Sequence, residues 1–253
     1  MQINKLFTPY NHNPGSIDRI KYIVIHYVGA LGGARANCQW YAGGDRGASA
    51  HYFVDFDGAV WQSVEDKDIA WHCGAKNYRH PECRNANSIG IEMCVRNKGS
   101  QADTSHDWYF EDATVAAAIR LTRELMNKYH VPADHVIRHY DVTGKICPNP
   151  YVYNTTAHTW GAFKAALEAP AYEIGWHHDS HGWWYAYSTT ECYRSCWQVI
   201  NHHKYYFNSD GYTVTDWQLI DGKWYYFEPR AGHPLECAVY VTDGDGVQAP
   251  GEF

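Results

Sequence analysis

The sequence lacks a hydrophobic run long enough to cross a membrane, and it lacks an excess of positive charge. Its first residues, MQINKLFTPYNHN, hold no apolar segment with a small-residue cleavage site, so we expect no export signal. Residues 1–169 carry balanced charges, and the whole formal charge of −7 lies in residues 170–253. We therefore expect neither nucleic acid nor a membrane to be a partner.

Cysteine is not scarce, because the chain has eight. In a chain without an export signal, most cysteines are expected to be free and buried as small hydrophobic residues. Only the pairs 73/83 and 192/196 are close enough in sequence to suggest disulfides, and the sequence leaves both open.

The first 169 residues alternate between strand and helix patterns, which predicts an α/β domain with a central sheet. The hydrophobic runs at 21–27, 88–95 and 135–140 indicate strands, and residues 50–64 indicate a hairpin that turns at Asp57-Gly58. Helices are predicted over 34–44, 111–130 and 158–169. The stretch 138–150, RHYDVTGKICPNP, is expected to be non-helical because it is rich in Gly and Pro.

From residue 170 onward the pattern changes to a repeat rich in aromatic residues. WQVINHHKYYFNSDG (197–211) and WQLIDGKWYYFEPRAG (217–232) align with their leading Trp residues 20 positions apart, and residues 176–187 form a looser copy. This period predicts stacked β-hairpins, so residues 170–253 are expected to be a separate small solenoid.

The stretch 138–150 places His139, Lys145 and Cys147 within a few positions of one another. Neutral His and thiolate Cys are preferred zinc ligands, and a catalytic zinc needs three of them. His26, near the end of the buried 21–27 strand, is the best third candidate because ligands in open α/β sheets bind at strand ends. Each residue alone is more often structural, and the spacing matches no standard zinc motif.

Five segments of the first domain resemble the N-acetylmuramoyl-L-alanine amidase type 2 family, which is related to the peptidoglycan recognition proteins. They are KYIVIHYVG, SAHYFVDFDG, AWHCG, NSIGIEMCV and RHYDVTGKICP. The resemblance covers about residues 18–165. It implies zinc held by His26, His139 and Cys147, a mixed sheet flanked by helices, and hydrolysis of the amide that joins N-acetylmuramic acid to L-alanine.

The same resemblance suggests roles for three further residues. Glu92 is expected to move the proton between water and the leaving nitrogen, and Lys145 to stabilise the oxyanion. His72 is expected to line the substrate groove. Ala50 stands where some relatives have a catalytic Tyr, which argues against a phenol-assisted mechanism.

The tail resembles cell-wall-binding (choline-binding) repeats. Such repeats form aromatic cages that bind quaternary ammonium groups through ring faces. The expected wall-contacting rings are Trp176, Trp183, Trp197, Tyr205, Trp217 and Trp224. Either choline on teichoic acid or a wall polysaccharide stacked on the rings fits this pattern, and Lys204 departs from it by replacing the hairpin Trp in the middle copy.

The sequence therefore predicts a zinc-dependent peptidoglycan amidase at 1–169 with a wall-binding domain at 170–253. The expected role is that of a phage or prophage endolysin, made in the host cytoplasm and acting on the bacterial cell wall at lysis. Two alternatives stay open: a non-catalytic peptidoglycan recognition module, and a wall-anchored lectin whose N-terminal domain binds no zinc.

Overall fold

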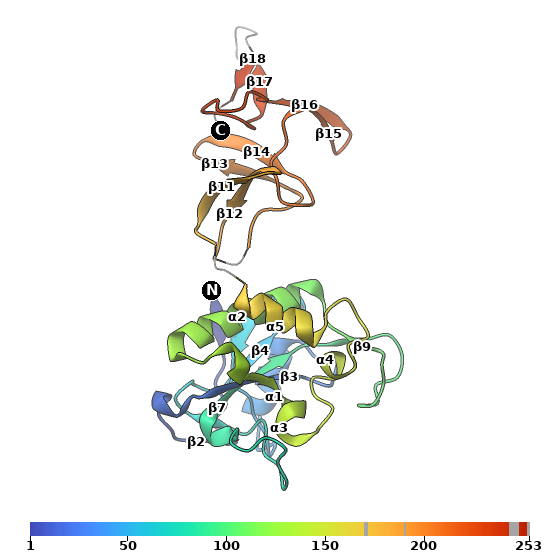
Figure 1. The fold of residues 1–253 in the computed structure, drawn as a ribbon. Helices are drawn as coiled ribbons and strands as arrows, with labels where there is room; N and C mark the ends of the chain where they lie inside the picture. Colours follow the sequence, from blue (N-terminus) through green and yellow to red (C-terminus); the bar gives the residue numbers. More distant parts are fainter. Residues whose placement is uncertain (170–171, 190, 243–247, 252–253) are drawn as a thin grey trace. The chain divides into compact units, whose positions relative to one another are not determined.

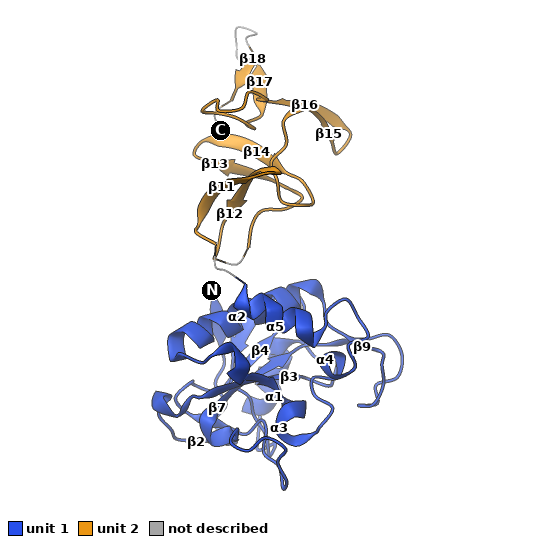
Figure 2. Cartoon of the chain, viewed as in Figure 1, with its two compact units in different colours: residues 1–169 blue, residues 170–253 orange. Residues whose placement is uncertain are grey.

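The computed structural model describes residues 1–169, 172–189, 191–242 and 248–251. The chain divides into two compact units, Met1–Ala169 and Pro170–Phe253 (Figure 2). Each unit has its own hydrophobic clusters and is described separately below.

Unit 1 is built on a six-stranded mixed sheet in the order β1-β5-β4-β7-β3-β10. The four strands β4, β7, β3 and β10 run parallel to one another, whereas β5 pairs antiparallel with β4 through a hairpin that turns at Gly58 with φ +83°. The sheet strands are β1 (Ile3–Lys5), β3 (Tyr22–Tyr27), β4 (Tyr52–Val54), β5 (Val60–Gln62), β7 (Ser88–Met93) and β10 (Val136–Arg138).

Helices cover both faces of this sheet (Figure 1). The long helix α2 (Asp112–Tyr129) and α5 (Trp160–Glu168) pack on the face formed by Ile23, Ile25 and Ile89. On the other face α1 (Ala34–Ala42) packs against Phe53, and α3 (His139–Thr143) packs against Val24. Because both faces are covered, β3 is buried along its whole length, as expected for a parallel strand.

Short elements complete unit 1. They are β2 (His12–Asn13), β6 (Ile69–Ala70), β8 (Arg96–Asn97), β9 (Trp108–Tyr109), α4 (Asn149–Tyr153) and three 3₁₀ turns at Ile17–Arg19, Asn85–Asn87 and Ala133–His135. The predicted α/β class with a mixed central sheet is confirmed.

The prediction of a non-helical stretch at 138–150 was wrong. Strand β10 ends at Arg138, and the five residues of α3 follow immediately. The Asp141 carboxylate accepts hydrogen bonds from the Arg138 backbone N–H and guanidinium, which caps the first turn. Gly144 ends the helix in the left-handed region, at φ +86°. A cap and a terminal glycine therefore allow one helical turn before the Gly and Pro residues of this stretch.

Unit 2 consists of two-stranded antiparallel hairpins (Figure 1). In the first three hairpins the leading tryptophan pairs with a tyrosine at the same register position: Trp176 with Tyr185, Trp197 with Tyr206, and Trp217 with Tyr226. The hairpins are β11-β12 (Gly175–Asp179, Gly182–Ala186), β13-β14 (Cys196–Ile200, His203–Phe207) and β15-β16 (Asp216–Ile220, Lys223–Phe227).

A further hairpin, β17-β18 (Tyr240–Thr242, Gln248–Pro250), follows these three. This hairpin was not predicted from the sequence, because its first strand lacks the leading Trp of the other three. In the described part of the chain, no helix has the length and apolar character needed to span a bilayer.

Candidate metal centre and substrate groove

Three neighbouring parallel strands bring the predicted residues of unit 1 to one edge of the sheet. In the register of β3 and β7, His26 lies directly beside Glu92. Ile25 pairs with Arg138, so His139 follows β10 at the next position of the same row. Residues in one row of a parallel sheet point to the same face. The fold therefore gathers His26, Glu92 and His139, which are far apart in sequence.

Cys147 joins this row from the loop between α3 and α4. Its Sγ lies 3.6 Å from Nδ1 of His26, and the rings of His26 and His139 meet edge to face at 4.7 Å. One donor atom from each of these three residues falls within 4.8 Å of the other two. All three side chains are buried, with exposed fractions of 1%, 6% and 2% for His26, His139 and Cys147.

A chain of hydrogen bonds behind His26 fixes which of its nitrogens faces the site. The Ser88 hydroxyl donates its proton to the carbonyl of Arg84 (2.6 Å), so its oxygen accepts from Nε2 of His72 (3.1 Å). Nδ1 of His72 then accepts from Nε2–H of His26 (3.0 Å). With its proton on Nε2, neutral His26 presents the lone pair of Nδ1 toward Cys147.

Burial sets the protonation of the three donors. It lowers the pKa of His26 well below its ordinary value and lowers the pKa of His139 to about 3, so both imidazoles are neutral. Burial also raises the pKa of the Cys147 thiol, and the nearby Glu92 adds to this effect. A cation among the donors would reverse that shift by favouring the thiolate.

These donors fit zinc. Two neutral imidazoles and one thiol form a ligand set that leaves a fourth position open. Nδ1 of His139 is buried, and it has no hydrogen-bond partner within the described structure. A buried acceptor without a partner costs free energy, about 1–3 kcal/mol, unless a ligand occupies it. The arrangement thus suits a metal ion better than a polar core.

Glu92 lies beside this donor set without belonging to it. Its Oε1 is 3.9 Å from Nδ1 of His26, and its Oε2 is buried without a partner in the part of the chain that is described. The side chain is 16% exposed. Burial raises the pKa of Glu92 to about 8, and the positive charge of Lys145 opposes this shift.

A groove with a volume of 680 Å³ opens at His139, one of the three donors. His139 forms part of its wall, and Lys145 and His72 line it as well. His72 thus lies where it was predicted to line the groove, and both of its ring nitrogens bond within the protein, to His26 and Ser88. The other lining residues are Gly47, Ala48, Trp71, Gly74, Ala75, Asn85 and Thr143.

Sequence reasoning missed Ser88 and Gly90, which support His72. A Cβ on Gly90 would lie 2.6 Å from Cγ of His72, so only glycine leaves room for this ring. The glycine in the segment SIGIE, between two apolar residues, could have pointed to a close contact at this position. A glycine in a strand can also mark a bulge or a bend, so the sequence alone does not identify the contact.

In unit 2, three of the predicted rings form one pocket. Trp176 and Trp183 of the first hairpin and Tyr205 of the second line a cavity of 340 Å³. His233 and the carboxylate-bearing Glu236 close its side, together with Gly232 and Pro234. Trp197, Trp217 and Trp224 lie elsewhere: Trp197 packs on Tyr225, and the other two are 59% and 65% exposed.

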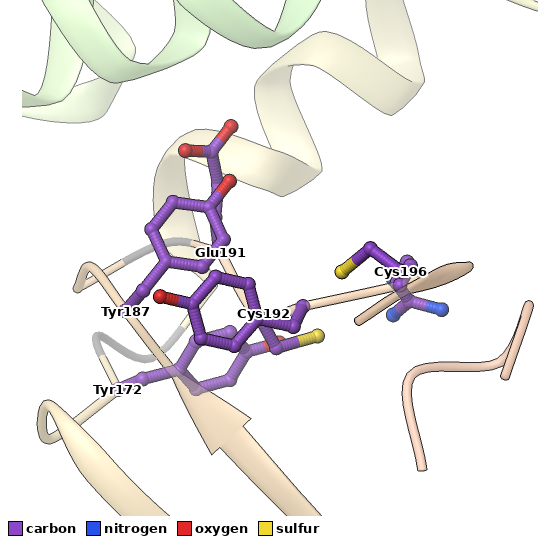
Figure 3. Close-up of a pocket in the computed structure, with 7 residues that line it drawn as sticks. Tyr172, Tyr187, Glu191, Cys192 and Cys196 are labelled. Carbon is purple, nitrogen blue, oxygen red and sulfur yellow. The ribbon is translucent and has the colours of Figure 1, made fainter. Parts of the chain in front are cut away.

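A second cavity of unit 2, of 490 Å³, is lined by tyrosines and thiols (Figure 3). Figure 3 shows the ring of Tyr187 beside Glu191, and Tyr172, Cys192 and Cys196 line the same cavity. Both thiols are free, as are those of Cys73, Cys83 and the remaining cysteines in the part that the structure describes.

The geometry of unit 1 agrees with a comparison of the sequence with protein families. The profile of N-acetylmuramoyl-L-alanine amidases matches residues 16–150. The chain belongs to this amidase family. A choline-binding repeat profile matches residues 194–234, within unit 2. The resemblance inferred from the sequence is thus confirmed for both parts of the chain.

Curated relatives of this amidase family member match its first unit. A probable N-acetylmuramoyl-L-alanine amidase of Bacillus licheniformis is 34% identical over 143 residues, which cover 53% of this chain and 37% of that protein. The amidase AmiD of Escherichia coli is 31% identical over 134 residues, covering 49% of this chain and 46% of AmiD. The chain therefore spans less than half the length of these relatives.

Solved structures match the same unit. The catalytic domain of XlyA has a TM-score of 0.52 at 27% identity, covering 66% of this chain and 99% of that domain. A mutant endolysin from Bacillus subtilis gives the same TM-score and identity, with the same coverage. The amidase fold of unit 1 is therefore shown by relatives of known structure.

Proposed function

We propose that this chain hydrolyses the amide between N-acetylmuramic acid and L-alanine in bacterial peptidoglycan, with zinc as its cofactor. The observation that carries the proposal is the set of His26, His139 and Cys147, whose donor atoms lie within 4.8 Å of one another beneath an open groove. Membership of the amidase family supports the bond that is cleaved.

His26, His139 and Cys147 would hold the metal, and Glu92, Lys145 and His72 would act around it. Zinc, when bound, acts as a Lewis acid and lowers the pKa of water toward 7. The chain must supply the rest of the chemistry. An amide has a poor leaving group, so its hydrolysis needs a base, a proton donor and a stabilised oxyanion.

Glu92 is placed to act as both base and acid. Its Oε1 lies 3.9 Å from the His26 nitrogen that faces the site, and its Oε2 has no partner in the described structure. Burial alone favours the protonated form, and the positive charge of a bound metal would favour the carboxylate. The carboxylate would accept a proton from the attacking water and return it to the departing L-alanine nitrogen.

Lys145 is placed to stabilise the oxyanion. Its side chain lines the groove next to His139 and is exposed to the substrate side. An ammonium at this position opposes the negative charge that develops on the carbonyl oxygen. His72 contributes by orienting His26, since its own nitrogens are already bonded.

The tail would hold the enzyme on the wall. The pocket of Trp176, Trp183 and Tyr205 offers ring faces, and Glu236 brings a negative charge to its rim. Ring faces with a carboxylate suit a quaternary ammonium such as choline on teichoic acid, because the cation gains a charge attraction that a neutral polysaccharide lacks. Similarity to an endolysin structure favours a lytic role on the bacterial wall.

Two variants separate metal binding from catalysis. Cys147→Ser should lose zinc, measured by elemental analysis of the purified protein, and should no longer clear a suspension of cell walls. Glu92→Gln keeps the shape of the side chain, so it should retain zinc and lose clearing by at least about 100-fold. Near-normal clearing by Glu92→Gln would exclude its proposed role, and clearing by metal-free Cys147→Ser would exclude zinc.

A further inference from the structure

The spaces between successive hairpins of unit 2 are built alike. In the first, the rings of Trp176 and Tyr205 meet at 4.8 Å and 67°. In the second, Trp197 and Tyr225 meet at 4.8 Å and 66°. We call these the first and the second cage. The agreement shows that the repeat is preserved in three dimensions as well as in sequence.

The two cages differ in their third wall. Trp183 and Lys204 are each the second residue of the returning strand of their hairpin, so they occupy equivalent positions. In the third hairpin the equivalent residue is Trp224. Only the middle hairpin of these three has a cationic side chain at this position.

The ammonium of Lys204 lies over the ring of Trp197, which is a wall of the second cage. Its Nζ is 4.8 Å from the centroid of Trp197, which is within the range of a cation–π interaction. A free cation bound in the second cage would compete for this same ring face. The second cage thus already holds a positive charge that belongs to the chain.

We propose that Lys204 is an internal cation that fills the second cage and restricts ligand binding to the first. This inference rests on the proposed function of the tail, in which the cages bind quaternary ammonium groups. A tethered group has an effective concentration in the millimolar range or above, so it competes well with a wall ligand of modest affinity. Lys204 therefore sets how many sites the tail offers.

The first cage has the features of the site that remains open. Trp183 supplies its third ring, and its cavity of 340 Å³ has Glu236 at the rim. The Glu236 carboxylate accepts a hydrogen bond from the Gly232 backbone N–H at 2.8 Å, which fixes its position. A cation in this cage is therefore met by rings and by a fixed negative charge.

The test is the stoichiometry of choline bound to the full chain, measured by isothermal titration calorimetry. The unaltered chain should bind one equivalent, and Trp183→Ala should bind none. Lys204→Trp removes the internal cation and restores the third ring, so it should bind two. Lys223→Trp, at an exposed position on the neighbouring hairpin, is the matched control and should still bind one.

A second measurement observes Lys204 directly. When the Lys204 ammonium lies over the indole ring of Trp197, its ε-methylene protons lie in the region that the ring current shields. Their NMR signals should therefore lie upfield of the ε-methylene signals of Lys223. This measurement needs no ligand and no substitution in the cage. It therefore tests the internal cation even if choline is not the ligand of the tail.

The outcomes are distinguishable. The proposal would be overturned if the unaltered chain bound two equivalents of choline, or if a folded Lys204→Trp variant bound only one. If the unaltered chain binds no choline, the proposed ligand of the tail is wrong, and the NMR signals decide the position of Lys204. An ordinary chemical shift would then overturn the internal cation, whereas an upfield shift would uphold it.

Discussion

Replacing Ser88 by alanine removes the hydroxyl at the end of the hydrogen-bond chain that orients His26. Ser88 donates to Arg84 at 2.6 Å and accepts from His72 at 3.1 Å. Without this hydroxyl, the Nε2–H of His72 loses the acceptor that keeps the proton on that nitrogen. His72 can then donate from Nδ1, which forces the His26 proton onto the nitrogen that faces Cys147.

Two separate effects follow from this substitution, one on stability and one on zinc affinity. The lost hydrogen bonds leave buried polar groups without partners, so the free energy of unfolding should fall by about 1–3 kcal/mol. The wrong tautomer of His26 must be corrected before zinc can bind. Loss of such an orienting partner costs about 10- to 100-fold in metal affinity, so the Kd for zinc should rise by this factor.

The assay is zinc affinity by competition with a chromophoric chelator, combined with ¹⁵N NMR of the His26 ring in the metal-free protein. Thr114→Val is the matched control, because it removes a buried hydroxyl that donates to the Asp55 carbonyl at 2.9 Å on the face covered by α2. This control should lose stability but keep its zinc affinity. If Ser88→Ala binds zinc within about twofold of the unaltered chain and keeps the His26 proton on Nε2, the reasoning is refuted.

Two further substitutions test the neighbours of the donors. Gly90→Ala places a Cβ 2.6 Å from Cγ of His72, so it should displace this ring. The free energy of unfolding should fall by about 1–3 kcal/mol, and zinc should bind more weakly. An unchanged Tm and zinc Kd would contradict this. Lys145→Met should lower kcat by about 10- to 100-fold, less than for a buried donor, because solvent screens an exposed ammonium. Zinc content should not change in Lys145→Met, and a loss of metal would show that Lys145 supports the ligands instead.

The sequence predicted the central strands and the metal donors because they depend on local patterns. The run at 21–27 is buried on both faces in the structure, and this is what its unbroken hydrophobic pattern indicates. His139 and Cys147 were identified by their closeness in the stretch 138–150, and His26 by its place at the end of that strand. The resemblance to the amidase family implied the same three residues. The row of His26, Glu92 and His139 then follows from parallel register.

Other features depend on contacts that no local pattern encodes. The turn of helix at α3 depends on the Asp141 cap, which the Gly and Pro content of the stretch obscured. His72 was predicted to line the groove, and it does, whereas its bonds to residues 46 positions before it and 16 after it could not be predicted. The departure of Lys204 from the repeat was visible in the sequence, whereas its position over Trp197 needed the register of two hairpins.

The central claim is tested most directly by mass spectrometry of the products released from purified peptidoglycan. The unaltered, zinc-loaded chain should release stem peptides with a free L-alanine N-terminus, and Cys147→Ser should release none. Walls that bind the protein but keep every muramoyl–peptide bond intact would contradict the account, and they would indicate a recognition module on the amidase fold.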